Sequence, residues 1–156
     1  MKRWIDSAED MHSYGRQLGR CLKGGEFIEL VGDVGAGKTT LTKGIAEGMG
    51  ISETIQSPTF TISRNYESPD GRRLAHYDFY RLPEAGIMND ELEEASRDPK
   101  TVVVVEWADA VRGVVPADHL RLSFATPSET TRDVSVTGSG QTSERVIEEL
   151  RREAAA

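Results

Sequence analysis

A glycine-rich loop at residues 32–39 constrains this chain more than any other part of its sequence. The loop reads Gly-Asp-Val-Gly-Ala-Gly-Lys-Thr and matches the pattern G-x-x-x-x-G-K-[ST] at Gly32, Gly37, Lys38 and Thr39. In loops of this pattern, backbone N–H groups surround phosphate oxygens, the lysine reaches the β- and γ-phosphates, and the hydroxyl binds Mg²⁺. We call residues 32–39 the phosphate-binding loop. It predicts a site for a nucleoside triphosphate with magnesium.

The sequence on both sides of the phosphate-binding loop supports this interpretation. Glu26–Val31 is a short apolar run, which predicts a buried strand. After the loop, apolar residues recur at positions 41, 45 and 49, a spacing that places them on one helix face. Gly35 and Gly37 allow backbone angles that a residue with a Cβ avoids, and Thr40 offers a further donor toward the α-phosphate. Strand, loop and helix in this order disfavour a glycine-rich turn without chemical role.

The rest of the chain alternates between predicted helices and strands. Ser7, with an aspartate three residues later, predicts a helix start, and Ser68-Pro69-Asp70-Gly71 predicts a turn between two strands. Helices are predicted at 7–23, 83–97 and 141–152, and strands at 54–66, 74–80, 101–106, 120–124 and 133–137. We expect one α/β domain over residues 1–156, with a P-loop NTPase three-layer fold in which helices flank a central mixed, partly parallel sheet.

Composition limits where such a chain can act. The 156 residues include no apolar stretch long enough to span a bilayer and no basic-then-apolar leader. We therefore expect a cytoplasmic protein that does not bind a membrane. The single cysteine, Cys21, excludes a disulfide within the chain, and its place on an apolar helix face predicts a core residue.

The net charge of −7 argues against a protein that binds nucleic acid by itself. If the chain acts in an RNA pathway, we expect it to reach the RNA through a partner. Six carboxylates lie within residues 84–98, where Arg97 is the one basic residue. A solvated helix face and a docking surface for a basic partner are both consistent with this segment.

Phosphoryl-transfer sites also need a carboxylate at the end of a strand beside the phosphate-binding loop. Glu106 ends the predicted strand Thr101–Glu106, whose four valines indicate deep burial. Asp78 lies in the sequence His-Tyr-Asp-Phe-Tyr-Arg at 76–81, where strand alternation places it on a polar face. That face suits a strand bordering a nucleotide cleft, but an ordinary half-exposed strand would show the same alternation.

A short hydroxyl-bearing segment, Ser-Pro-Thr-Phe at 57–60, follows the helix predicted after the loop. In nucleotide switches, a hydroxyl in this place commonly senses the γ-phosphate and magnesium. A turn stiffened by Pro58 accounts for the same residues equally well.

Four motifs in this chain together resemble the TsaE family (formerly YjeE), small bacterial ATPases of tRNA threonylcarbamoyladenosine biosynthesis. They are the loop with the threonine that follows it (32–40), Ser-Pro-Thr-Phe (57–60), His-Tyr-Asp-Phe-Tyr-Arg (76–81) and Val-Glu-Trp (105–107). A single motif other than the loop is weak evidence, but four in the same order and spacing are specific.

The resemblance implies an ATPase that works with two protein partners, TsaB and TsaD. These partners transfer a threonylcarbamoyl group to the adenosine next to the anticodon of tRNAs that read codons beginning with A. The family member does not make the modification itself. Its ATP hydrolysis is implied to reset the TsaB–TsaD complex between cycles, so that it reaches tRNA only indirectly.

The resemblance also implies roles for individual residues, with ATP and Mg²⁺ as the bound groups. Thr39 and Glu106 are implied to bind Mg²⁺. Asp78 and Lys38 are implied to be the catalytic residues, and Asp78 is the one that orients or deprotonates the attacking water. Arg81 belongs to the family pattern as either a phosphate contact or a structural ion pair. The residues implied to bind the nucleotide are Gly35, Ala36, Gly37, Lys38, Thr39 and Thr40, with Thr59 in the switch-like segment and Trp107 beside the nucleotide.

Two other functions are compatible with a phosphate-binding loop in a chain of this length. A small-molecule kinase needs an acceptor pocket and usually an arginine-bearing lid over the phosphates, whereas Arg72 and Arg73 lie on a predicted hairpin turn. A nucleotide-gated binding module would bind ATP but hydrolyse little of it. A GTPase is disfavoured because the sequence has no Asn-Lys-x-Asp segment to read guanine.

Overall fold

Strands and helices alternate along the chain, as the sequence predicts. The computed structural model describes residues 1–56, 63–80 and 88–155. Its elements are β1 (Lys2–Ile5), α1 (Ala8–Cys21), β2 (Phe27–Val31), α2 (Lys38–Gly48), β3 (Ser63–Glu67), β4 (Arg73–Asp78), α3 (Met88–Arg97), β5 (Thr101–Glu106), the 3₁₀ helix η1 (Ala108–Val114), β6 (Leu120–Ala125), β7 (Arg132–Gly138) and α4 (Gln141–Ala155).

Four parallel strands form the centre of one mixed sheet. Within the described residues the strand order is β1-β7-β6-β2-β5-β4-β3, and β6, β2, β5 and β4 run parallel to one another. The outer strands β7, β1 and β3 pair antiparallel, which confirms the predicted mixed, partly parallel sheet. Parallel strands end at the same edge of a sheet, where α/β proteins usually bind their ligands. β2 therefore brings the phosphate-binding loop to the edge where Asp78 of β4 pairs in register with Glu106 of β5.

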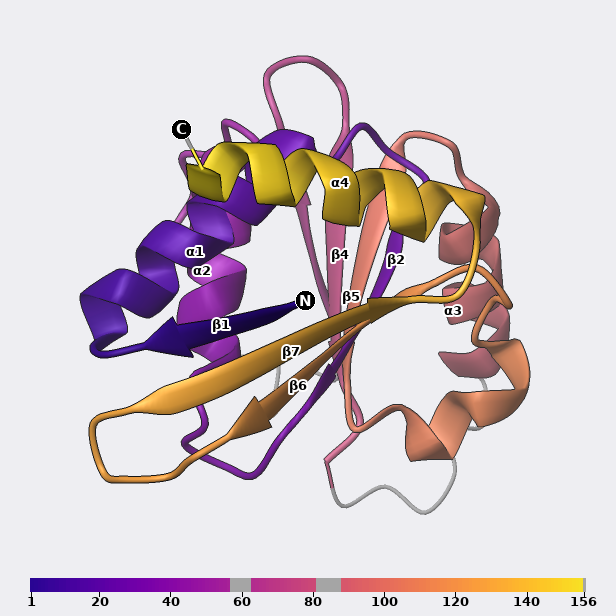
Figure 1. The fold of residues 1–156 in the computed structure, drawn as a ribbon. Coiled ribbons are helices and arrows are strands. Elements are labelled where there is room, and N and C mark those ends of the chain that lie inside the picture. The colour runs from indigo at the N-terminus through magenta and orange to yellow at the C-terminus, as the bar shows by residue number, and fades with distance from the viewer. Residues whose placement is uncertain (57–62, 81–87, 156) are drawn as a thin grey trace.

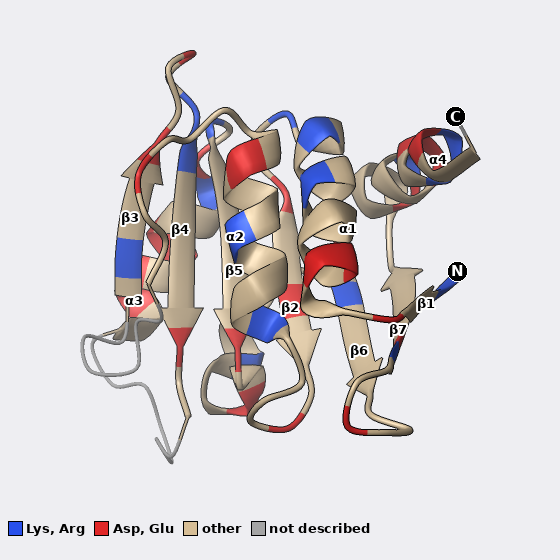
Figure 2. Cartoon of the chain, turned by 90° about the vertical axis from the view of Figure 1, so that its left-hand side faces the viewer, with Lys and Arg blue, Asp and Glu red and all other residues tan. Residues whose placement is uncertain are grey.

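Helices cover both faces of the sheet and give the protein three layers (Figures 1 and 2). α1, α2 and α4 share one hydrophobic core with the sheet, and α3 and η1 share another on the opposite face. The valines of β5 alternate between the two cores, because Val102 and Val104 belong to the first and Val103 and Val105 to the second. A strand covered on both faces needs apolar residues at successive positions, which explains the four-valine run.

The helices α1 and α2 cross with their backbones in direct contact. Two glycines of α1, Gly15 and Gly19, face two glycines of α2, Gly44 and Gly48. A Cβ atom on Gly44 would lie only 2.2 Å from the carbonyl oxygen of His12. Backbone atoms cannot rotate away from such a contact as a side chain can. The glycines therefore set how closely α2, which begins within the phosphate-binding loop, lies to α1.

The first helix begins where the sequence predicts. Ser7 is its N-cap, and the Ser7 hydroxyl accepts a hydrogen bond from the N–H of Asp10 at 3.0 Å. The carboxylate of Asp10 in turn accepts the N–H of Asp6 at 3.2 Å, one residue before the cap, and a hydrogen bond from Arg3 at 3.2 Å. These bonds fix the turn between β1 and α1.

Two short elements, β1 and η1, are not predicted from the sequence. β1 has four residues and a single buried side chain, Ile5, so it is too short to show strand alternation. η1 follows β5 after one residue, and Val111 within it has non-helical backbone angles. An interrupted 3₁₀ helix has no apolar period of 3.6 residues for a sequence pattern to detect.

Several predicted element ends differ from the structure by one to three residues, and two predicted elements extend into residues that the structure does not describe. β4 ends at Asp78 instead of residue 80. Of the predicted strand 54–66, residues 54–56 are not in a strand, residues 57–62 lie outside the described residues, and β3 begins at Ser63. Of the predicted helix 83–97, residues 83–87 also lie outside the described residues, and the described part, Met88–Arg97, is the helix α3.

Two observations bear on the expectations drawn from composition. Cys21 is buried in the core as predicted, and this burial raises the pKa of its thiol to about 11. Across the three described ranges, no helix is both long enough and apolar enough to cross a membrane.

Candidate functional site

The phosphate-binding loop connects the end of β2 to the start of α2. Gly35 and Gly37 have φ angles of 85° and 105°, which residues with a Cβ rarely adopt, and Gly37 is the N-cap of α2. The N–H of Leu41 bonds to the carbonyl oxygen of Gly37 at 2.9 Å. The N–H groups before Leu41 in the helix have no acceptor within it, and the helix dipole adds partial positive charge there. The loop thus has the geometry of an anion site at a helix N-terminus.

The ammonium group of Lys38 is held between three groups that attract a cation. Its Nζ donates to the carbonyl oxygen of Gly32 at 2.5 Å, lies 3.9 Å from Oε1 of Glu106, and lies 4.3 Å from the centre of the Trp107 ring. Burial lowers the pKa of Lys38, and the carboxylates of Glu106 and Asp78 oppose this shift. The ammonium group that is expected to bind phosphate therefore lies in a buried position beside the carboxylate of Glu106.

Glu106 ends β5 as predicted, and His76 on the neighbouring strand fixes its carboxylate. Oε2 of Glu106 lies 2.6 Å from Nε2 of His76, whose side chain is fully buried. Nδ1 of His76 has no hydrogen-bond partner within the described part of the chain. The contact with His76 orients the carboxylate of Glu106 at the end of β5.

β4 carries Asp78 to the same edge of the sheet. Leu74 belongs to the core beneath α1 and α2 and Tyr77 to the core beneath α3, so the predicted alternation of faces is confirmed. The alternative of a half-exposed strand is wrong, because residues 74–78 are all buried between helices on both faces. Asp78 is 7% exposed, and its Oδ1 accepts the N–H of Tyr80 at 2.9 Å.

Lys38, Asp78 and Glu106 line one cavity of about 320 Å³, which we call the loop cavity. Figure 2 shows acidic residues at the ends of β4 and β5, beside the start of α2. Of the predicted site residues, Ala36 does not line this cavity, and Thr59 lies outside the described residues, as does Arg81. The lining consists of Val34, Gly35, Gly37, Lys38, Thr39, Thr40, Asp78, Tyr80, Glu106 and Trp107.

Trp107 has a strained backbone at the rim of the loop cavity. With φ of 59° it lies in the left-handed region, where no other residue except glycine is found in the described ranges. The centre of its ring lies 4.9 Å from that of Tyr80. Such strain costs on the order of 1–3 kcal/mol and persists where the surroundings fix the residue. The contacts with Tyr80 and Lys38 fix the indole beside the cavity.

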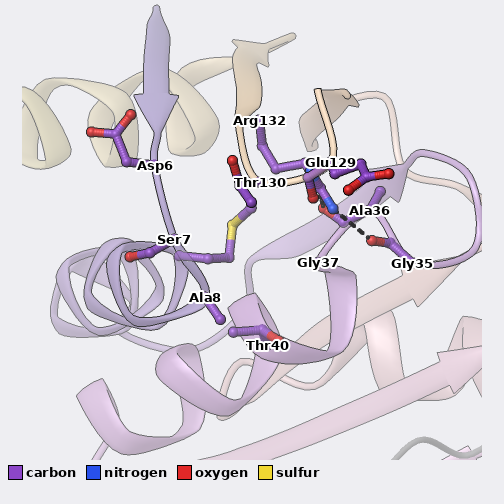
Figure 3. Close-up of a pocket in the computed structure, with 11 residues that line it drawn as sticks. Asp6, Ser7, Ala8, Gly35, Ala36, Gly37, Thr40, Glu129, Thr130 and Arg132 are labelled. Carbon is purple, nitrogen blue, oxygen red and sulfur yellow. Dashed lines mark hydrogen bonds between the residues drawn. The ribbon is translucent and has the colours of Figure 1, made fainter. Parts of the chain in front are cut away.

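A second cavity, of about 420 Å³, adjoins the phosphate-binding loop (Figure 3). We call it the hairpin cavity, because the β6–β7 hairpin forms one of its walls. Gly35, Gly37 and Thr40 line both cavities, so the two meet at the loop. No sequence motif indicated this space, because its walls come from three separate segments. The remaining lining residues are Asp6, Ser7, Ala8 and Met11 at the start of α1, Ala36 of the loop, and Glu129, Thr130 and Arg132 of the hairpin.

The two arginines considered for a kinase lid lie at the other edge of the sheet. Arg73 is the first residue of β4 and forms an ion pair with Glu67 at 3.5 Å. Arg72 donates to the carbonyl oxygens of Leu22 and Met49. Both side chains therefore bond to groups near the start of β4, whereas Asp78 is at its end. Neither arginine lines the loop cavity, so neither forms a lid over it.

The described part of the acidic segment, residues 88–98, lies mostly on α3, on the face of the sheet opposite α2. Asp90, Glu91 and Glu94 are exposed, as expected for a solvated helix face. The alternative, a docking surface for a basic partner, stays a prediction.

The loop cavity offers oxygen ligands suited to magnesium. Thr39 and Glu106 both line it, and Mg²⁺ is usually held by one or two protein oxygens together with phosphate oxygens and water. No cluster of three or more His, Cys, Asp or Glu side chains that could hold a metal occurs in the ranges that the structure describes. The donor set therefore fits a Mg²⁺ ion shared with a bound triphosphate.

Comparison with known proteins gives consistent matches over most of the chain. The sequence model of the family "Threonylcarbamoyl adenosine biosynthesis protein TsaE" matches residues 5–134. The tRNA threonylcarbamoyladenosine biosynthesis protein TsaE of Streptomyces coelicolor is 40% identical over 139 residues, which cover 84% of this chain and 92% of that protein. The protein of the same name from Bacillus subtilis is 39% identical over 149 residues, which cover 92% of this chain and 89% of that protein.

The fold also matches a solved structure. The crystal structure of Bacillus subtilis YdiB superimposes with a TM-score of 0.82 at 32% sequence identity. The match covers 99% of this chain and 95% of that chain. The similarity therefore extends over the sheet and the helices on both of its faces.

Proposed function

This chain belongs to the TsaE family of tRNA threonylcarbamoyladenosine biosynthesis proteins, and from that membership we propose that it is a Mg²⁺-dependent ATPase of this pathway. It hydrolyses ATP in complex with TsaB and TsaD and thereby resets the machinery that transfers the threonylcarbamoyl group. The negative net charge of −7 supports contact with tRNA through these partners instead of directly. We place the protein in the cytoplasm, together with the tRNA modification to which it contributes.

One observation supports the proposal above all: Lys38 and Thr39 of the loop, Asp78 of β4 and Glu106 of β5 come from three separate parts of the chain and line the same cavity. A phosphate-binding loop alone does not define a reaction. A cation for the phosphates, a hydroxyl and a carboxylate for the metal, and a second carboxylate near the γ-phosphate position are the groups that phosphoryl transfer to water requires. Their convergence supports hydrolysis.

The two cavities suit the two halves of a nucleotide. We place the triphosphate on the phosphate-binding loop and in the loop cavity, where Gly35, Gly37 and the start of α2 offer N–H donors. The base and ribose occupy the hairpin cavity, which meets the loop cavity at Gly35, Gly37 and Thr40. Trp107 borders the phosphate end of this arrangement.

Four polar side chains of the loop cavity, and His76 beside one of them, have a role in this proposal. Thr39 and Glu106 hold Mg²⁺, which when bound would neutralise charge on the phosphates. His76 orients Glu106. Lys38 leaves its present contact with Gly32 to reach the β- and γ-phosphates. Asp78 accepts a proton from the attacking water or orients it. In the proposed reaction water is the nucleophile, and the γ-phosphate is released as inorganic phosphate.

The metal assignment predicts that ATP binds more tightly with Mg²⁺ than without it, and that Glu106→Gln removes this difference. Gln can still accept the hydrogen bond from His76, but it lacks the charge that attracts the cation. Titration calorimetry with ATP, in Mg²⁺ and in excess chelator, measures the difference directly.

A matched control is Glu29→Gln. Glu29 is an equally buried strand carboxylate, 1% exposed, but it lies on the other face of the sheet, in an ion pair with Arg112. This variant should keep the magnesium dependence. Equal ATP affinities with and without Mg²⁺ in the wild type would refute the assignment of Thr39 and Glu106.

A further inference from the structure

Arg132, the first residue of β7, connects the β6–β7 hairpin to the phosphate-binding loop. Its Nε donates to the carbonyl oxygen of Ala36 at 3.2 Å, and its Nη2 donates to the carbonyl oxygen of Gly35 at 3.2 Å. Figure 3 shows the Arg132 side chain at the hairpin cavity, pointing toward Gly35 of the loop. The two acceptors are consecutive carbonyls in the centre of the phosphate-binding loop.

The other nitrogen of the same guanidinium holds the turn of the hairpin. Nη1 lies 3.1 Å from the carbonyl oxygen of Ser128, 3.2 Å from that of Glu129 and 2.8 Å from that of Thr131. All of these partners are backbone carbonyl oxygens and none is a carboxylate. The positive charge of Arg132 adds to the field that an anionic ligand meets at the loop.

The direction of the carbonyls determines the direction of the neighbouring N–H groups. In a trans peptide the C=O and the following N–H point in opposite directions. When Arg132 holds the carbonyl of Ala36, the N–H of Gly37 must point to the other side of the loop. The bond to the carbonyl of Gly35 likewise fixes the N–H of Ala36, which lies 3.1 Å from the carbonyl oxygen of Asp33.

The guanidinium also offsets an electrostatic cost. The carbonyl oxygens of Gly35 and Ala36 are the negative ends of peptide dipoles, and they lie in a loop built to receive a polyanion. A cation bonded to both oxygens reduces their repulsion of phosphate. Arg132 can do this with fixed geometry, because its planar fork presents several donors at once.

We propose that Arg132 is a positioning residue of the nucleotide site, which pre-orders the phosphate-binding loop and aligns it with the hairpin wall of the second cavity. This inference rests on the proposed function, since it assigns the two cavities to one nucleotide. Arg132 acts on the nucleotide through the carbonyls of Gly35 and Ala36 and through the residues 128–131 that it holds. A loop that is already ordered binds more tightly, because less conformational freedom is lost on binding.

The test compares Arg132→Ala and Arg132→Lys with a matched control, Arg72→Ala. Arg72 also bonds to two backbone carbonyls, those of Leu22 and Met49, but at the opposite edge of the sheet, where it forms an ion pair with Asp70 as well. Arg72→Ala therefore reports the general effect of removing such a bond. Two measurements are made on each full-length variant: ATP affinity by titration calorimetry in Mg²⁺, and hydrogen exchange of the amides of the phosphate-binding loop without nucleotide.

Arg132→Ala is expected to weaken ATP binding on the order of tenfold and to speed exchange of the loop amides, because the loop loses its cross-link to the hairpin. Arg132→Lys should fall between Ala and wild type, since it keeps the charge without the fork. Arg72→Ala should match wild type in both measurements at the loop.

Loop exchange and ATP affinity in Arg132→Ala that equal those of wild type, or that change no more than in Arg72→Ala, would overturn the proposal. Should Arg132→Ala fail to fold, the Lys variant decides, because wild-type loop exchange in that variant contradicts a role for the fork. A wild-type chain that binds no ATP would instead contradict the proposed function, and the exchange data would still decide whether Arg132 orders the loop.

Discussion

Replacement of Asp78 by asparagine is expected to slow ATP hydrolysis by about 100- to 10,000-fold and to leave ATP binding nearly unchanged. Asparagine has the same shape and keeps an oxygen that can accept the N–H of Tyr80. It lacks the charge needed to take a proton from water. The phosphate-binding loop and the ligands assigned to Mg²⁺ stay in place, so binding energy should be preserved.

The measurement is phosphate release at saturating Mg²⁺–ATP, accompanied by calorimetric titration of ATP. Asp90→Asn is a suitable control because Asp90 is an exposed residue of α3, on the opposite face of the sheet. If Asp78→Asn hydrolyses ATP like wild type, Asp78 has no role in activating water. If it loses hydrolysis but still supports tRNA modification fully, the protein acts as a nucleotide-gated binding module.

Gly44→Ala is expected to lower the stability of the protein by about 3 kcal/mol, because the new methyl group meets backbone on the facing helix. The Cβ would lie 2.2 Å from the carbonyl oxygen of His12 and 2.8 Å from the Cα of Gly15. Relief requires α1 and α2 to move apart. The better helix propensity of alanine offsets only about 1 kcal/mol of this cost. For a chain of this size the melting temperature should fall by roughly 6–12 °C.

Thermal unfolding followed by circular dichroism gives the comparison, with Gly113→Ala as the control. A Cβ on Gly113 of η1 would meet no atom within 4 Å, so this variant should melt close to wild type. A Gly44→Ala protein that melts as wild type does would show that the two helices separate without cost. The close backbone contact would then not determine the spacing of α1 and α2.

Much of the loop cavity could be predicted from the sequence, because its residues lie where local patterns end. The loop motif places Lys38 and Thr39 at a helix start. The valine run places Glu106 at the end of a buried strand, and parallel strands bring their ends to one edge. The alternation around Asp78 predicted the correct face. Its depth of burial could not be predicted, since that depends on helices packed on both sides of the sheet.

The remaining features depend on contacts between distant segments. The bond between His76 and Glu106 joins two neighbouring strands, and a lone histidine in a strand gives no signal of it. Arg132 lies 97 residues after Gly35 in the sequence, yet its side chain reaches that carbonyl. The hairpin cavity is formed by the start of α1, the loop and the hairpin, which meet only in the folded chain. Single-sequence patterns describe local periodicity and cannot identify such pairs.

The close approach of α1 and α2 could be predicted only in part from the sequence. Glycines at 15 and 19 and at 44 and 48 have the spacing of one helix face, and each pair is visible in the sequence. Glycine inside a helix is unfavourable by itself, so its presence indicates some compensating constraint. Only the structure identifies that constraint as contact between the two backbones.

Release of inorganic phosphate from ATP measures directly whether this chain is a Mg²⁺-dependent ATPase that works with TsaB and TsaD. It should be made with the purified chain alone and with TsaB and TsaD, each with and without Mg²⁺, and with Lys38→Ala as the inactive reference. The account predicts hydrolysis that requires Mg²⁺, increases with the two partners and is lost in Lys38→Ala. Absence of phosphate release under all these conditions, or rapid transfer of the phosphate to a small metabolite instead of water, would contradict it.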